Sequence, residues 1–201
     1  LNPHFLFNML NNIRALVLED PERARDALAK LSDMLRYSLR ETEFNKVRLA
    51  EEVLMVEEYL ELCAIQFEDR LNYEFEVASD TRDVLIPRML LQLCIENAIK
   101  HGISKLKQGG KIRVSARIIE KLLVLEIVNP TPERTARVQN LKEENHRGIG
   151  LKNIQERIKL LYSHEERSDE LGLVFLKNDD NHEAKVTIKL PIEFERKELT
   201  T

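Results

Sequence analysis

The sequence predicts an α+β protein in which a helical hairpin precedes an α/β sandwich, a mixed sheet covered by helices on one face. Up to about residue 70, apolar residues recur at intervals of three and four, which is the period of amphipathic helices. Beyond that point, stretches that alternate apolar and polar residues, typical of strands, are interspersed with further helical patterns. We therefore expect two domains, residues 1–70 and 71–195.

Three helices are expected in the first domain. The first covers residues 5–17, and Asp20-Pro21 supplies the N-cap and first-turn proline of a second that runs to about residue 39. The short join makes these two helices an antiparallel hairpin, and pairing two hairpins into a four-helix bundle would cover the apolar face left open. A third helix, residues 49–67, links the hairpin to the second domain.

The second domain should contain five strands and two helices. Pro87 is expected to open the first helix, and the polar segment 130–147, too long for an idle connection, is expected to be a lid. The predicted order along the chain is strand 73–77, helix 87–101, strand 112–118, strand 122–128, helix 149–162, strand 171–177 and strand 184–190.

Composition excludes several classes of partner and site. Lys and Arg number 31 against 35 Asp and Glu, a net charge of -4, so no basic surplus favours nucleic acid. Cys63 and Cys94 lie in apolar helical patterns, which indicates buried thiols in a reducing compartment rather than a disulfide or zinc site. No apolar run approaches the ~20 residues that span a bilayer. Because the chain begins at Leu1, we interpret it as a piece of a longer protein.

Asn97 lies among apolar neighbours on the predicted helix 87–101, with Lys100 and His101 three and four residues later on its side. An amide oxygen suits magnesium, and a nearby ammonium suits the phosphates that the metal bridges. Glu96 adds a carboxylate beside it. A helix with a solvated polar face explains this spacing equally well.

Two glycines, Gly148 and Gly150, follow the polar segment and open the next helix. Glycine permits close approach of the backbone, and the unpaired amides of a helix start can face a phosphate. A flexible turn is the commoner explanation of such a pair. No phosphate-loop or dinucleotide fingerprint is present.

His4 and Asn8 are four residues apart, on one face of the first helix. A neutral imidazole exposed on a bundle can act as a nucleophile, and Asn8 could orient a water. Taken alone, a solvated histidine near a chain end is the favoured interpretation.

Three sequence words bring these weak signals together. They are NPHFLFN at residues 2–8, ENAIKHG at residues 96–102 and GIGLKN at residues 148–153. In this order, and over nearly the whole chain, they resemble the LytS/YehU-type sensor histidine kinases.

The resemblance implies a dimerising helical hairpin followed by a Bergerat-type ATP-binding domain, with ATP and magnesium as cofactors. It makes His4 the phosphoacceptor and Asn97 the magnesium residue. The reverse reaction, in which water removes phosphate from a partner response regulator, would depend on Asn8. The remaining residues assigned to the ATP site are Lys100, His101, Gly148, Gly150, Leu151 and Asn153.

Two positions depart from the family pattern. Asn129 stands where many members have an aspartate that meets the adenine amino group. Its side-chain oxygen can still accept that hydrogen bond, but without charge assistance, so weaker ATP binding is expected. Phe5 follows His4 where many histidine kinases have an acid, so the general base is unassigned there, and Glu96 is the candidate because it neighbours Asn97.

The predicted function is ATP-dependent autophosphorylation of His4 and transfer to an aspartate of a response regulator. The chain would be the cytoplasmic part of a homodimeric, membrane-anchored bacterial protein whose sensor region lies upstream. The alternative is a degenerate ATP-binding dimeric signalling module without kinase activity, for which the missing aspartate is the best support. A serine kinase or simple ATPase on the same fold is disfavoured by the hairpin that carries His4.

Overall fold

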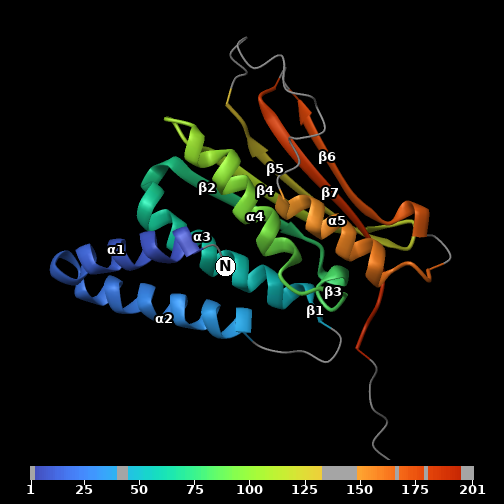
Figure 1. Ribbon diagram of the computed structural model, residues 1–201, viewed down its shortest axis with the longest axis horizontal. Coiled ribbons are helices and arrows are strands. Elements are labelled where there is room, and N and C mark those ends of the chain that lie inside the picture. The colour runs from blue at the N-terminus through green and yellow to red at the C-terminus, as the bar shows by residue number, and fades with distance from the viewer. Residues whose placement is uncertain (1–2, 40–44, 133–148, 166–167, 179–180, 196–201) are drawn as a thin grey trace, which may run out of the picture.

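A computed structural model describes residues 3–39, 45–132, 149–165, 168–178 and 181–195 (Figure 1). It confirms the α+β class: a hairpin of helices lies beside a layer of helices that covers one face of a five-stranded sheet. None of the helices in these ranges is long and apolar enough to cross a membrane.

The hairpin consists of α1 (Pro3–Glu19) and α2 (Pro21–Leu39). Asp20 is the predicted N-cap of α2, because its Oδ1 accepts a hydrogen bond of 3.0 Å from the backbone N–H of Arg23. The two helices pack antiparallel over small and apolar side chains. Their buried residues are Met9, Ile13, Ala24, Ala27, Leu31 and Met34.

Helix α3 (Leu49–Phe67), with the bounds expected from sequence, lies between the hairpin and the sheet. It packs against α1, α2 and α4, and a single cluster of buried residues runs from the hairpin through α3 into the sheet. Cys63 and Cys94 are buried free thiols, as predicted. The division into two domains at residue 70 remains a prediction.

The sheet has the strand order β2-β4-β5-β7-β6, with β2 parallel to β4 and the other pairs antiparallel. Its inner face is apolar, as at Val114 and Ile127, and is covered by α4 and α5 (Figure 1). The strands are β2 (Leu71–Val77), β4 (Gly110–Ile119), β5 (Leu122–Pro130), β6 (Gly172–Asn178) and β7 (Glu183–Pro191), and the helices are α4 (Leu90–His101) and α5 (Ile149–Leu161). All the strands predicted for this domain are confirmed within two residues at each end.

One sequence prediction is wrong. Pro87 ends a short strand, β3 (Leu85–Pro87), which pairs with β1 (Lys46–Arg48), instead of opening α4. Proline is tolerated in a strand at an edge, and Met89, with a left-handed φ of 61°, turns the chain so that α4 begins at Leu90. Strands of three residues are too short to show an alternating pattern, so local pattern cannot predict this pair of strands. Short 3-10 turns occupy Glu68–Arg70, Ser79–Thr81, Ile103–Lys105 and Ser168–Glu170.

Candidate functional site

The first turn of α1 carries His4, the predicted phosphoryl acceptor. Its backbone is helical, and its side chain lies outside the part of the chain that the structure describes. Asn8, one turn later, is half-buried and has an interaction partner. The predicted pair therefore shares one helix at the expected spacing.

An aromatic contact anchors the start of α1 on α3. The ring centroids of Phe5 and Tyr59 lie 4.7 Å apart, with the ring planes at 44°, and Tyr59 is buried. Burial, followed by the charges of Cys63 and Glu96, raises the pKa of Tyr59, and α3, which carries Tyr59, packs against α4, which carries Glu96. Phe5, the residue after His4, therefore packs against Tyr59 on the helix that contacts α4.

Glu96 has the environment expected of a proton acceptor. It is half-buried, and its Oε1 accepts a hydrogen bond of 3.1 Å from Nε2 of Gln92. Burial raises the pKa of Glu96, and the Gln92 hydrogen bond opposes part of that rise. A carboxyl group whose pKa is raised toward neutrality is a better general base at physiological pH.

Asn97 is half-buried on α4, while Lys100 and His101 are exposed in its last turn. Burial, together with the positive charges of Lys100 and Lys105, lowers the pKa of His101. Within the described ranges, no group of three or more His, Cys, Asp or Glu residues could hold a metal ion. A magnesium ion at Asn97 would therefore take most of its oxygen ligands from ATP phosphates and water, which is the usual way in which this ion is held.

The end of β5 meets the end of α4 at Gly102. A Cβ atom on Gly102 would lie 2.4 Å from Nδ2 of Asn129 and 2.6 Å from the carbonyl oxygen of Pro130, so no larger residue fits without movement. Asn129 is buried, and its Nδ2 donates a hydrogen bond of 2.9 Å to the Pro130 carbonyl. With the nitrogen used in this way, the side-chain oxygen is the atom that can accept a bond from an adenine amino group.

Thr131 is a further candidate residue of the site, and sequence pattern does not predict it. It is 8% exposed, and its Oγ1 is buried without a hydrogen-bond partner, although its N–H donates to the His182 carbonyl at 2.6 Å. An unpaired buried hydroxyl is uncommon, and this one lies two residues after Asn129. A threonine in a polar loop carries no sequence signal for such a position.

The predicted phosphate cradle is only partly described. Gly148 and the predicted lid lie outside the described residues. Gly150 is exposed in the first turn of α5, with open space where a Cβ would stand. Leu151 is buried in the core, so its side chain anchors α5, and Asn153 is exposed. The ligand contacts assigned to these residues remain predictions.

Known proteins similar to this chain are sensor kinases. The family model described as "Histidine kinase" matches residues 1–71. The sensor histidine kinase BtsS of Escherichia coli (strain K12) is 33% identical over 192 residues, which is 95% of this chain and 32% of BtsS. The sensor histidine kinase/phosphatase LytS of Staphylococcus aureus (strain Mu50) is 33% identical over 169 residues, 81% of this chain and 29% of LytS.

Solved structures support the fold. The catalytic domain of the histidine kinase ThkA, in a nucleotide-free form, aligns with a TM-score of 0.50 and 17% identity, covering 77% of this chain and 100% of that domain. The chain spans about a third of the length of its curated relatives. Over that part, the family model and the curated relatives agree that the chain is similar to the LytS-type sensor histidine kinases.

Proposed function

We propose that the chain is the cytoplasmic catalytic portion of a two-component sensor histidine kinase, which phosphorylates His4 with ATP and passes the phosphoryl group to an aspartate of a response regulator. The observation that carries the proposal is the Phe5–Tyr59 contact. It holds the start of the helix that bears His4 on α3, and α3 packs against α4, the helix that bears Glu96 and Asn97.

The chemistry follows from these residues. The unprotonated nitrogen of the His4 imidazole attacks the γ-phosphorus of ATP, an N–P bond forms, and the bond to the bridging oxygen breaks to release ADP. Glu96 takes the proton lost from the imidazole, which its raised pKa favours. The side-chain oxygen of Asn97 would hold magnesium, and the bound ion would neutralise negative charge on the phosphates. Lys100 would add a second positive charge on that side.

The test is incubation of the chain with γ-labelled ATP and magnesium. A phosphohistidine is expected, so the label should be lost in acid, kept in base, and absent from His4→Gln. Glu96→Gln should lower the initial rate by about 10²-fold if Glu96 is the base. Label on His4→Gln would contradict the proposal.

The second candidate, a degenerate binding module, is favoured by one observation, the amide at Asn129 in place of a carboxylate. It predicts tight ATP binding without labelling. We expect weakened binding instead, which Asn129→Asp should strengthen, because a charged acceptor makes a hydrogen bond about twice as strong. Equal ATP affinities of wild type and Asn129→Asp would contradict that expectation.

Dimerisation through the hairpin is the remaining part of the proposal. Phe7, Leu10 and Val17 share one face of α1 and are 68%, 50% and 52% exposed. An apolar stripe of this kind on a hairpin is typical of a bundle interface. Light scattering should give the mass of a dimer for wild type and of a monomer for Leu10→Glu; a wild-type monomer would contradict it.

A further inference from the structure

Glu52, in the first turn of α3, is a fully buried carboxylate. Its Oε1 accepts hydrogen bonds from Oη of Tyr37, at 2.6 Å, and from the backbone N–H of Met89. Its Oε2 accepts a bond of 3.2 Å from the backbone N–H of Leu91. A buried carboxylate is tolerated only when such donors replace its lost water. Glu52 is therefore held by donors from α2 and from the start of α4.

These bonds also complete the start of α4, the helix that bears Asn97. The first N–H groups of a helix have no partner within it, and the N-cap position, Met89, makes no side-chain hydrogen bond that could supply one. Glu52, on α3, supplies an acceptor for the N–H groups of Met89 and Leu91. A negative charge is also favourable at a helix N-terminus. The position of α4 is therefore tied to Glu52 of α3.

The end of α2 is tied to the same point. Tyr37 lies in the last turn of α2, and the guanidinium of Arg88 lies 5.7 Å from the centre of its ring. Nη2 of Arg88 donates a bond of 2.9 Å to the carbonyl oxygen of Ser38. Burial and the charge of Glu52 raise the pKa of Tyr37, which keeps the phenol protonated and able to donate.

Helix α5, which follows the predicted lid, also makes hydrogen bonds to the residues just before α4. Nη1 of Arg157 donates a bond of 2.7 Å to the carbonyl oxygen of Arg88, and its Nη2 donates a bond of 3.2 Å to that of Asn45. The residues just before α4 are thus held by α2, α3 and α5 together. We define the polar junction as Tyr37, Glu52, Arg88 and Arg157.

We propose that Tyr37 and Glu52 are positioning residues, which set the hairpin that bears His4 against the helix that bears Asn97 and thereby control the rate of phosphoryl transfer. The proposal rests on the proposed kinase function. Tyr37 is the hairpin side chain that enters the polar junction, and its single hydroxyl joins α2 to a carboxylate that also holds α4. Neither residue needs to touch ATP.

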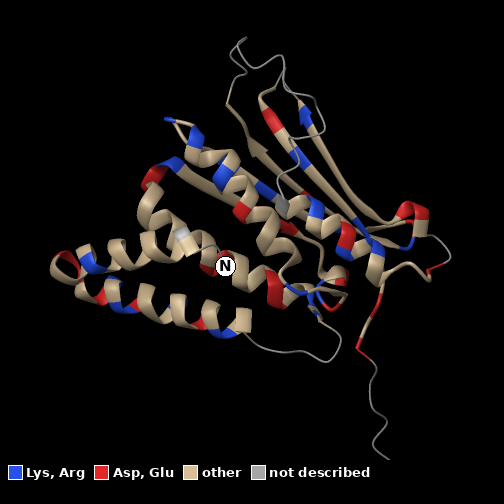
Figure 2. Ribbon diagram, in the orientation of Figure 1, with Lys and Arg blue, Asp and Glu red and all other residues tan. Residues whose placement is uncertain are grey.

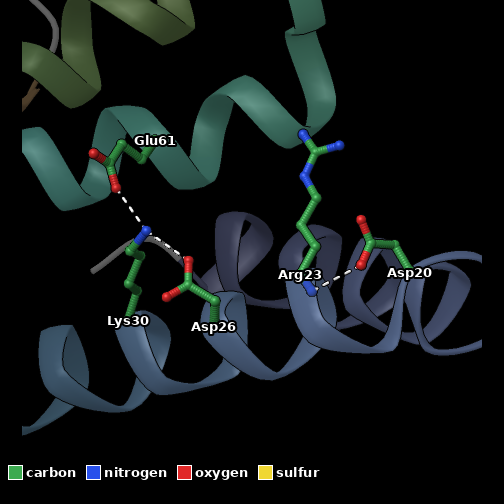
Figure 3. Close-up of polar contacts among 5 residues, drawn as sticks. All are labelled: Asp20, Arg23, Asp26, Lys30 and Glu61. Atoms are coloured by element: carbon green, nitrogen blue, oxygen red, sulfur yellow. Dashed lines mark hydrogen bonds and ion pairs between the residues drawn. The ribbon is translucent and has the colours of Figure 1, made fainter.

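The chain offers a matched control on the same face of α2, two turns before Tyr37. Nζ of Lys30 on α2 lies 2.7 Å from Oε2 of Glu61 on α3 and 2.7 Å from Oδ2 of Asp26 (Figure 3). These groups, with Arg23, border an open cleft of about 320 Å³ between the two helices. Because water reaches this contact, it does not fix the helices as the polar junction does.

The first measurement compares wild type, Tyr37→Phe and Lys30→Met. The initial rate of autophosphorylation is measured at saturating Mg-ATP, and the Kd of ATP is measured separately. Tyr37→Phe should lower the rate about tenfold without changing the Kd, because small misplacements of reacting groups are costly. Lys30→Met should change neither. An unchanged or raised rate in Tyr37→Phe would overturn the proposal, as would a loss of rate explained by weaker ATP binding.

The second measurement does not depend on phosphorylation. Spin labels are attached after Ser32→Cys on α2 and Ser104→Cys beyond α4, both exposed, while Cys63 and Cys94 are buried. The distance distribution between the labels should broaden in Tyr37→Phe and stay narrow in Lys30→Met. If wild type is not phosphorylated but the distribution broadens, the kinase function fails and the positioning role stands. An unchanged distribution in Tyr37→Phe overturns the positioning role.

Discussion

Two polar contacts between α2 and α3 have nearly the same length, but one is buried and the other is exposed to water. Oη of Tyr37 lies 2.6 Å from Oε1 of Glu52, and Nζ of Lys30 lies 2.7 Å from Oε2 of Glu61. Glu52 is fully buried, whereas the Glu61 side chain is 47% exposed. Access of water therefore distinguishes the contacts, because water competes for exposed hydrogen bonds and screens exposed charges.

Because of this difference, the two contacts of α2 are expected to have different roles. Figure 2 shows charges of both signs along α2, and most of these side chains are exposed and replaceable by water. At its last turn, by contrast, α2 supplies the Tyr37 hydroxyl to the buried carboxylate of Glu52. We infer that the hairpin is positioned by the polar junction, and that the Lys30 contact adds solubility and a small electrostatic gain.

The largest effect is expected from Glu52→Ala. The substitution leaves the Tyr37 hydroxyl and the N–H groups of Met89 and Leu91 without their acceptor. Buried unsatisfied groups and broken buried polar networks cost several kcal/mol, so the free energy of unfolding should fall by about 3 kcal/mol. Urea unfolding followed by circular dichroism measures it.

Glu51→Ala is the control for that substitution. Glu51 is the neighbouring acid, and its bond of 3.1 Å to Nε of Arg48 is exposed. Its loss should cost less than about 0.5 kcal/mol. Equal losses in Glu51→Ala and Glu52→Ala would show that burial does not distinguish the two sites.

A smaller effect, with a defined pH dependence, is expected from Glu52→Gln. Burial raises the pKa of Glu52 in the folded chain from an ordinary value of 4.5. The stabilisation that this gives is fully present below the unfolded pKa and is lost as the pH rises through the folded pKa. Urea unfolding at a series of pH values should show the wild type losing stability relative to Glu52→Gln above about pH 4.5. A difference that does not vary with pH would contradict the shift.

Much of this fold could be predicted from local pattern. The bounds of α3 and the N-cap at Asp20 agree with the structure because each depends on residues close in sequence. The prediction for Pro87 is wrong because the residue it pairs with, Lys46 of β1, lies far away in the sequence. Pairing over such a separation leaves no local signal.

The polar junction is not predictable from sequence for a related reason. Glu52 looks like one of two acids in the first turn of a helix, where acids are common. A signal was present, since Glu52 lies three residues after Leu49 and four before Val56, on the apolar face of α3. Which donors would satisfy a carboxylate there could not be predicted, because they come from α2 and from the turn before α4. In the same way, the sequence identified Asn129 but not the use of its nitrogen by Pro130.

Arg157→Lys tests the far side of the polar junction. The guanidinium reaches two carbonyl oxygens, those of Arg88 and Asn45, and a lysine ammonium cannot match this planar fork. Losing one such bond at a half-buried position should lower the free energy of unfolding by about 1 kcal/mol. Lys159→Ala, at an exposed position of the same helix, should change it by less than about 0.5 kcal/mol. No loss in Arg157→Lys would separate α5 from the polar junction.

The smallest effect is expected from Lys30→Met, in which methionine keeps the apolar stem and removes the charge. Hydrogen bonds to Asp26 and Glu61 raise the pKa of Lys30 to about 12, which at face value indicates a strong contact. The Asp26 and Glu61 side chains are 62% and 47% exposed, so water and salt screen both pairs. The free energy of unfolding should therefore fall by only about 0.5 kcal/mol, and by less at high salt. A loss as large as that in Glu52→Ala, unchanged by salt, would mean that the exposed contact positions the hairpin after all.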